Sequence, residues 1–526
     1  SGTAVLYSKG MYQPFQFFMP AQIFFGAGSL DNLGSAPLPG TKALIVIGGT
    51  SVKRLGYLDR VQALLKKQGV ESVVFDKVQP NPVVEHVMEA ASLARETGCD
   101  FVIGLGGGSS MDSAKSIAVM AANPGNYWDY IQGGSGKGLP IPNKPLPIVC
   151  ITTTAGTGTE ADPWTVITKE DTQEKIGFGC RGTFPTMSIV DPELMLSVPP
   201  KLTAYQGFDA LFHAVEGYMA TIASPMGDMF ALQAIEYIAK YLPRAVNNGD
   251  DLEARAYVAL ANTYSGFVET ISCCTSEHSI EHALSAFHPS LPHGAGLIMI
   301  SWAYHEAYAP SCPERYARVA AAMGQEASVD GFLNGLNKLK EACGVDKLKN
   351  IGAALKTCKW MCTGGVNAKN VNNYLGYNQI IAVGGTWMCK SDKIKAGAWD
   401  EITAMSREAV DVMLGLELGH IGINCADEAE AAKTAETIAN LLSMAVKVGN
   451  SSIFVGKKEF EIMKKPGRGT NGHIAILTNN VDRAIYHLGQ RGVQFDMDSK
   501  NVKDGKTVAI YFADEIAGFA FHLVQR

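Results

Sequence analysis

The chain has 526 residues, of which 47% are hydrophobic and 18% charged, so it is long enough for about three folded domains. A net charge of −6 gives no reason to expect nucleic acid or an anionic membrane as partner. No apolar run reaches the roughly 18 residues of a membrane span, and we see no secretory signal pattern. The 11 cysteines include no CxxC pair, so we expect reduced thiols and a cytoplasmic protein.

Residues 43–154 alternate strand-type runs with amphipathic helical runs. ALIVIGG, SVVFDKV and FVIGLGG are strand-type, and a helical pattern follows each of them. This alternation predicts βαβ units that stack into a parallel sheet with helices on both faces. We place the end of this α/β domain near residue 198, at the prolines of DPELMLSVPP.

Two glycine-rich and hydroxyl-rich loops follow predicted strands of this sheet. The first, GGGS, opens a helix, where glycines let the backbone approach a pyrophosphate and helix amides bind its charge. A tight turn without any ligand would show the same four residues. The second loop, TTTAGTGTE, also follows a predicted strand, and open α/β sheets bind ligands at that edge. Together the loops favour a nucleotide phosphate site.

An aspartate and four histidines recur at helical or turn spacing in the later, helix-patterned part of the chain. Asp209 and His213 are four residues apart, as are His278 and His282, and His293 follows in the turn LPHG. A carboxylate and imidazoles suit Fe²⁺ or Zn²⁺. Any one of these histidines alone would be an ordinary core or surface residue. The spacing leaves open which three histidines bind.

Residues 1 to about 350 resemble the iron-containing alcohol dehydrogenases. The resemblance lies in FFGAGSLDNLG, GGGSSMDSAK, TTTAGTGTEA, DPELMLSVPP, GFDALFHAVEGY and HSIEHALSAFHPSLPHG, in that order. It implies a dinucleotide-binding domain over 1–198 and an all-helical metal-binding domain, truncated, over 199–350. It also implies hydride transfer between NAD(P)H and a small alcohol or aldehyde polarised by Fe²⁺, with Zn²⁺ as the alternative metal.

The motifs shared with this family imply roles for individual residues. Asp209, His213, His278 and His293 would bind the metal, and His282 would relay protons beside the nicotinamide. The expected cofactor contacts are Gly106, Gly107, Gly108, Ser109, Asp112, Thr153, Thr154, Thr157 and Lys175.

The end of the first predicted strand bears on the choice of cofactor. Its residues are Gly48, Gly49, Thr50 and Ser51. Lys53 and Arg54 follow, without the carboxylate that usually binds the adenosine ribose and repels a 2′-phosphate. Cations and hydroxyls favour a phosphate, so we expect NADP to be preferred, with NAD as the alternative.

Residues 351–526 show two further patterns. WMCTGGVNAKNV and AGAWDEITAMSREAV, within 351–415, resemble the C-terminal end of a 2-keto-3-deoxy-6-phosphogluconate aldolase, which implies a partial TIM barrel. That family's Schiff-base lysine and catalytic glutamate have no counterpart here. In 416–526, GHIGIN and GHIAILTNN open two similar segments, which predict a duplicated βαβββ unit resembling a glyoxalase-like (vicinal oxygen chelate) domain.

The glyoxalase-like resemblance implies metal ligands on the first and last strands of each unit. His420, Glu461, His473 and His522 occupy those places. They would either bind a metal or be ordinary strand residues of a binding or packing module.

The join near residue 350 unites two incomplete folds. The helical domain before it is truncated, and the barrel fragment of two units after it leaves strand edges and apolar faces uncovered. We therefore hypothesise a chimera. The leading function is that of an alcohol dehydrogenase or aldehyde reductase acting as a homo-oligomer. The alternative is a non-catalytic composite in which the aldolase-like and glyoxalase-like parts serve binding or assembly.

Overall fold

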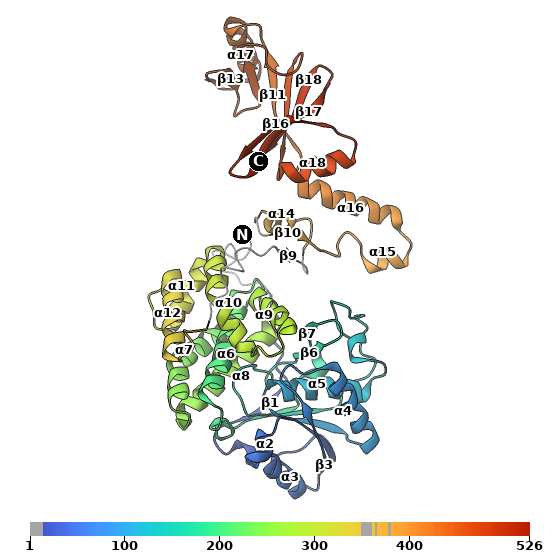
Figure 1. Ribbon diagram of the computed structural model, residues 1–526, viewed down its shortest axis with the longest axis vertical. Coiled ribbons are helices and arrows are strands. Elements are labelled where there is room, and N and C mark those ends of the chain that lie inside the picture. Colours follow the sequence, from blue (N-terminus) through green and yellow to red (C-terminus); the bar gives the residue numbers. More distant parts are fainter. Residues whose placement is uncertain (1–13, 349–359, 363–365, 377–379) are drawn as a thin grey trace. The chain divides into compact units, whose positions relative to one another are not determined.

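The computed structural model describes residues 14–348, 360–362, 366–376 and 380–526. The chain divides into two compact units, residues 1–356 and 357–526, and each is described by itself (Figure 1). The join predicted near residue 350 falls within residues 349–359, which lie outside the described part. None of the described helices is long and apolar enough to cross a membrane.

A six-stranded parallel sheet, in the order β1-β8-β5-β4-β2-β3, forms the first half of the first unit. Its strands are apolar on both faces, because alternate residues pack on opposite helix layers. Leu44 and Val46 pack with α4 and α5, whereas Ala43 and Ile45 pack with α3. The predicted parallel sheet with helices on both faces is confirmed. The elements are β1 (Gln22–Phe25), β2 (Lys42–Gly48), α2 (Ser51–Arg54), α3 (Tyr57–Lys67), β3 (Glu71–Val78), α4 (Val84–Thr97), β4 (Phe101–Gly106), α5 (Gly108–Ala122), β5 (Ile148–Thr152), the hairpin β6 (Thr165–Lys169) and β7 (Glu174–Phe178), and β8 (Met187–Val190).

The second half of the first unit is helical, as predicted. Its central helix, α6, packs against α7, α8, α10 and α11 and is buried from Gly207 to Met219. Any polar side chain on that stretch therefore lies inside the protein. The helices are α6 (Pro200–Met219), α7 (Pro225–Asn247), α8 (Leu252–Ile271), α9 (Ser276–Phe287), α10 (His293–Tyr308), α11 (Pro313–Ala322) and α12 (Val329–Ala342).

The loop between β5 and β6 connects these two halves. The buried Glu160 carboxylate accepts hydrogen bonds from Asn262 (2.9 Å) and Thr263 (2.8 Å) on α8. A Cβ on Gly266 would lie 2.2 Å from the backbone oxygen of Gly158, so only glycine lets the loop and α8 cross this closely.

The second unit begins with a small parallel pair of strands and then forms an eight-stranded sheet. The first strand of each half of this sheet pairs in parallel with the last strand of that half, and the two first strands, β11 and β15, pair antiparallel at the centre. The two halves thus have the duplicated βαβββ order that the sequence predicts. Both family resemblances in this unit stay predictions. The elements are β9 (Trp360–Cys362), α14 (Val371–Leu375), β10 (Ile380–Val383), α15 (Ser391–Lys395), α16 (Trp399–Leu414), β11 (Glu417–Asn424), α17 (Glu428–Leu442), β12 (Val446–Val448), β13 (Ser452–Val455), β14 (Phe460–Met463), β15 (Gly472–Thr478), α18 (Val481–Gln490), β16 (Phe495–Lys503), β17 (Lys506–Ile516) and β18 (Phe519–Gln525).

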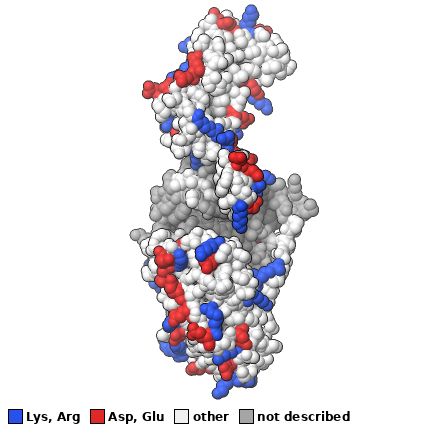
Figure 2. Space-filling view, turned by 90° about the vertical axis from the view of Figure 1, so that its right-hand side faces the viewer, with Lys and Arg blue, Asp and Glu red and all other residues white. Residues whose placement is uncertain are grey.

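The charged surface is mixed in sign. On the face shown in Figure 2, basic side chains are interspersed with acidic ones on both units. This distribution agrees with the small net charge of −6.

Candidate functional site

Loops that follow three neighbouring strands, β2, β4 and β5, gather at one edge of the sheet. Gly108, Ser109 and Thr157 line a cavity of about 330 Å³ there. A Cβ on Gly108 would lie 2.4 Å from the Thr157 side chain, so a larger residue would push the two loops apart. The other predicted cofactor residues in these loops are not among the residues that line the cavity: Gly48, Gly49, Thr50, Ser51, Gly106, Gly107, Thr153 and Thr154.

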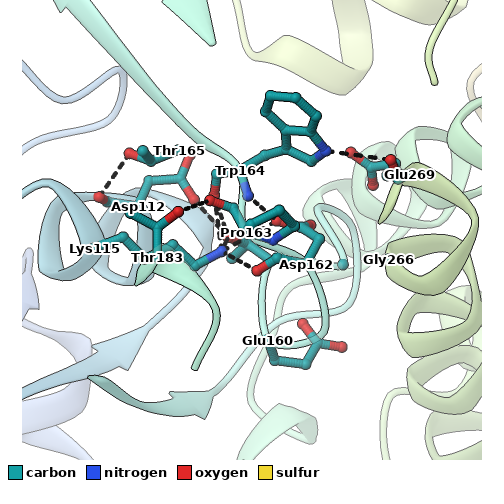
Figure 3. A network of polar contacts seen from close by, with 12 residues as sticks. Asp112, Lys115, Glu160, Asp162, Pro163, Trp164, Thr165, Thr183, Gly266 and Glu269 are labelled. Atoms are coloured by element: carbon teal, nitrogen blue, oxygen red, sulfur yellow. Dashed lines mark hydrogen bonds and ion pairs between the residues drawn. The ribbon is translucent and has the colours of Figure 1, made fainter. Parts of the chain in front are cut away.

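The position of the second loop is set by a buried network that Figure 3 shows. The Lys115 ammonium on α5 is fully buried and lies 3.1 Å from the Asp162 carboxylate. Asp112, predicted as a cofactor contact, lines the cavity, but its carboxylate already accepts hydrogen bonds from Thr159 Oγ1 (2.8 Å) and the Val166 amide (2.9 Å). In this structure Asp112 therefore braces the loop.

The predicted metal ligands converge at the other end of the cavity. Asp209 Oδ1 lies 3.3 Å from His278 Nε2, 3.4 Å from His293 Nε2 and 3.6 Å from His213 Nδ1. Ligand bonds of about 2.1 Å in a tetrahedral site place neighbouring donor atoms roughly 3.4 Å apart. Asp209, His278 and His293 form one compact group, and His213 stacks on His278 with ring centroids 4.1 Å apart.

The protonation states in this cluster suit a metal site. Burial disfavours ionisation of Asp209, but His213 and His293 outweigh it and hold the pKa of Asp209 well below its usual value. Burial lowers the pKa of His213 to about 3, which leaves its imidazole neutral and able to bind a metal. The His213 Nδ1 atom is also buried without a hydrogen-bond partner among the described residues. Burial alone would lower the pKa values of His278 and His293, but Cys274 and Glu216 raise the pKa of His278, and Glu281 and Asp209 raise the pKa of His293. These two imidazoles would therefore lose a proton when a metal binds. The anionic Asp209 carboxylate and the neutral His213 imidazole with its unpaired nitrogen fit a divalent ion.

Two buried carboxylates that sequence analysis missed lie behind these imidazoles. Glu216 pairs with Nδ1 of His278, and Glu281 pairs with Nδ1 of His293. Such outer partners orient a metal-binding imidazole and raise its basicity. Glu216 and His278 are 62 residues apart, and Glu281 and His293 lie on two different helices, α9 and α10, so no spacing within one helix indicated these pairs.

His282 and Lys175 line the same cavity as the predicted metal ligands and the predicted cofactor loop at the start of α5. The ring centroid of His282 lies 5.3 Å from that of His293. Burial, followed by the charge of Lys175, lowers the pKa of His282 well below its usual value. Lys175 donates to Asn81 Oδ1 (3.0 Å) and Ser285 Oγ (2.9 Å) and lies 4.0 Å from Glu281.

Glu269, Trp164 and Cys273 also line this cavity, and no sequence pattern singled them out. Burial, reinforced by Asp162, raises the pKa of Glu269 well above its usual value. The Trp164 indole nitrogen donates to the Glu269 backbone oxygen at 3.2 Å (Figure 3).

The second unit contains a separate cluster. His420 Nε2 lies 3.0 Å from His473 Nε2, and both lie near Glu461 Oε2, at 3.3 Å and 3.4 Å. A nitrogen of His522 lies within 4.8 Å of a nitrogen of each of the other two imidazoles, and the His522 Nε2 atom is buried with no hydrogen-bond partner in the part of the chain that the structure describes. The four residues lie on β11, β14, β15 and β18, which are adjacent in the sheet.

Two family models match consecutive parts of the first unit and its continuation. Residues 20–192 match the iron-containing alcohol dehydrogenase model, and residues 203–379 match the C-terminal model of the Fe-containing alcohol dehydrogenase family. The second match runs past the join predicted near residue 350. Neither match extends into residues 416–526.

Similar proteins of known function include the choline dehydrogenase of Bacillus subtilis (strain 168), 38% identical over 59% of this chain and 77% of that protein. The NADPH-dependent butanol dehydrogenase of Clostridium saccharobutylicum is 35% identical over 62% of this chain and 84% of that protein. Among solved structures, the NADH-dependent butanol dehydrogenase A of Thermotoga maritima has a TM-score of 0.59 and 31% identity. It covers 69% of this chain and 89% of its own.

Replacing Glu216 by Gln should weaken metal binding by about 10- to 100-fold, because His278 would lose the carboxylate that orients its ring. The matched control is Glu277→Gln, since Glu277 is equally buried but pairs with His305, 3.1 Å away and outside the cluster. Metal affinity should be measured by competition with a chelator. Equal affinities for both variants would show that Glu216 does not position His278.

Proposed function

The chain belongs to the iron-containing alcohol dehydrogenase family and catalyses NAD(P)-dependent alcohol–aldehyde oxidoreduction, and we propose how its own residues perform this reaction. The observation that carries the proposal is a single cavity. Its lining includes both the glycine-rich loop at the start of α5 and the cluster of carboxylate and imidazole groups. Family membership also favours a catalyst over a non-catalytic composite.

We propose that Asp209, His213, His278 and His293 hold a divalent ion, Fe²⁺ in preference to Zn²⁺. When bound, the ion would supply Lewis acidity toward the substrate oxygen, and a nicotinamide would exchange the hydride. The support is the spacing of 3.3–3.6 Å between Asp209 Oδ1 and the nearest nitrogen of each histidine.

The chain's own groups would bind the cofactor and handle the proton. The amides at the start of α5, with Ser109 and Thr157, are placed to bind phosphate oxygens. His282 is neutral, so its imidazole can accept the proton that leaves the alcohol hydroxyl and return it in the reverse reaction. The nearby Lys175 ammonium opposes full charging of His282, which favours prompt transfer of that proton to solvent.

Replacing His293 by Ala should remove the ion of the first unit and abolish alcohol oxidation. Replacing His282 by Ala should keep the ion and slow hydride transfer by about 10²- to 10⁴-fold, since only proton transfer is lost. The measurements are metal content of the intact chain and single-turnover absorbance of the reduced cofactor.

The control for both variants is His288→Ala, because His288 is an exposed histidine on the same segment. The His288→Ala protein should keep the metal content and the hydride-transfer rate of the wild type. A His293→Ala protein with normal metal content and normal rate would contradict the ligand assignment.

We further propose that NADP is preferred over NAD. The loop after β2 carries only small or hydroxyl residues from Gly49 to Ser51, which leaves room for a 2′-phosphate. Lys53 pairs with Asp76 on the neighbouring strand, a carboxylate that sequence analysis did not consider. A bound 2′-phosphate would compete with Asp76 for the Lys53 ammonium.

The catalytic efficiency, kcat/KM, should therefore be higher with NADPH than with NADH, and Lys53→Ala should reduce that ratio by about tenfold. Substitution of the exposed Lys66, on α3, by Ala serves as the control and should leave the ratio unchanged. Equal or better efficiency of the wild type with NADH would refute the preference.

For the second unit we propose a second divalent-ion site formed by His420, Glu461, His473 and His522. The support is again the donor spacing of 3.0–3.4 Å among three of them. The protonation states of Glu461 and His522 also suit the binding of a divalent ion. Hydrogen bonding to His473 lowers the pKa of Glu461 to about 2, and burial lowers the pKa of His522 to about 3.

The full chain should then bind two divalent ions, and His522→Ala should bind one. His487→Ala, a histidine on α18 outside the cluster, is the matched control and should bind two. Equilibrium dialysis followed by elemental analysis measures this stoichiometry. Identical metal content in the His522→Ala protein and the wild type would leave these four residues as ordinary strand positions.

A further inference from the structure

The hairpin of β6 and β7 contributes one wall of the cavity. Val166 on β6 pairs with Gly177 on β7, and both residues line the cavity. Trp164 directly precedes β6 and Gly179 directly follows β7, so each lies two residues from this pair and on the same face of the hairpin. Phe178 points to the opposite face, where it is buried in the core of the α/β half. Glycines at 177 and 179 thus leave the inward face of β7 hollow.

The Trp164 indole is held in place from two sides. Its six-membered ring lies so close to Gly179 that a Cβ on that glycine would be 2.7 Å from Cε3 of the indole. Its ring nitrogen donates a hydrogen bond of 3.2 Å to the backbone oxygen of Glu269 on α8 (Figure 3). The ring therefore reaches from the hairpin in the α/β half to a helix of the other half, and it cannot swing aside without breaking that hydrogen bond.

The indole nevertheless remains 40% exposed while it lines the cavity. An aromatic surface in this position gains free energy when an apolar group covers it. The groups proposed to bind the metal ion and the phosphates are polar and offer no apolar surface to the hydrocarbon part of an alcohol. Trp164 and Val166, beside the hollow at Gly177, form an apolar wall that does.

The volume available to that hydrocarbon is small. The cavity measures about 330 Å³, at the lower end of the range for ligand sites. It would have to accommodate the reacting end of a nicotinamide and the alcohol together. Further methylene groups fit into a filled site only when a side chain moves, and the Trp164 ring is fixed at both sides.

We propose that Trp164 is a specificity-determining residue whose fixed indole ends the space for the carbon chain of the substrate. The preferred substrates are then aliphatic alcohols of about four carbons or fewer. Gly179 is a positioning residue, because it sets how far the ring extends into the cavity. This inference rests on the proposed alcohol oxidation at the same cavity.

The test measures kcat/KM of the metal-loaded full chain for straight-chain 1-alkanols from ethanol to hexanol, at saturating cofactor. In the wild type, kcat/KM should fall by about tenfold for each methylene beyond butanol. Trp164→Ala removes the ring, so the ratio of hexanol to butanol should rise by about 100-fold. A ratio within one variant is unaffected by any general loss of activity.

Gly179→Ala tests the opposite direction. The added methyl group would lie 2.7 Å from Cε3 of the indole, so the ring must move away from β7. The ratio of butanol to ethanol should then fall by about tenfold. The same substitution in the Trp164→Ala background should leave that ratio unchanged, because Gly179 acts through the indole. An equal fall in both backgrounds would contradict this role.

Two substitutions elsewhere are matched controls. Trp399→Ala removes an exposed indole of the second unit, and Gly489→Ala adds a methyl group where no atom from another part of the chain lies within 4 Å. Both should keep the wild-type dependence on chain length. A wild type that prefers hexanol to butanol, or the same hexanol-to-butanol ratio in the wild type and Trp164→Ala, would overturn this inference alone. No oxidation of any of these alcohols by the wild type would overturn the proposed function as well.

Discussion

The buried ion pair between Lys115 and Asp162 is the interaction on which the cleft of the first unit depends. An ammonium group with no exposed surface is tolerated only when it is paired and fully hydrogen-bonded, and Lys115 also donates to Thr159 and to the backbone oxygen of Trp164. The pair therefore ties α5 to the loop between β5 and β6. That loop in turn binds α8 through Glu160 and places the Trp164 indole against it. One buried charge thus sets the distance between the glycine-rich loops and the cluster around Asp209.

Much of this architecture could be predicted from local sequence patterns. Strand-type runs separated by helical runs indicate a parallel sheet, and the four-residue spacing of Asp209 and His213 indicates one helix face. The carboxylates behind the cluster could not be found in this way, because Glu216 on α6 and His278 on α9 meet only in the tertiary structure. Asp112 shows the reverse case, in which a sequence motif suggested a role that the tertiary contacts do not require. Its place in the glycine-rich motif indicated a cofactor contact, but tertiary structure supplies its carboxylate with protein donors.

In the second unit the sequence repeat predicted the element order, because GHIGIN and GHIAIL both begin a strand. It could not predict how the two repeats would be joined. The antiparallel pairing of β11 with β15 sets His473 opposite Gly422, where a side chain would collide with the imidazole ring. The absence of a side chain at that position is what lets the His473 ring reach His420 and Glu461.

The position of Glu281 has a thermodynamic consequence. Its carboxylate contacts His293, a proposed metal ligand, and lies 4.0 Å from Lys175, a proposed cofactor contact that comes from the other half of the unit. A cofactor that draws Lys175 toward itself would leave more of the negative charge of Glu281 to His293 and so raise the basicity of that ligand. Metal and dinucleotide would then bind with positive cooperativity, and by linkage each would tighten the other by the same factor.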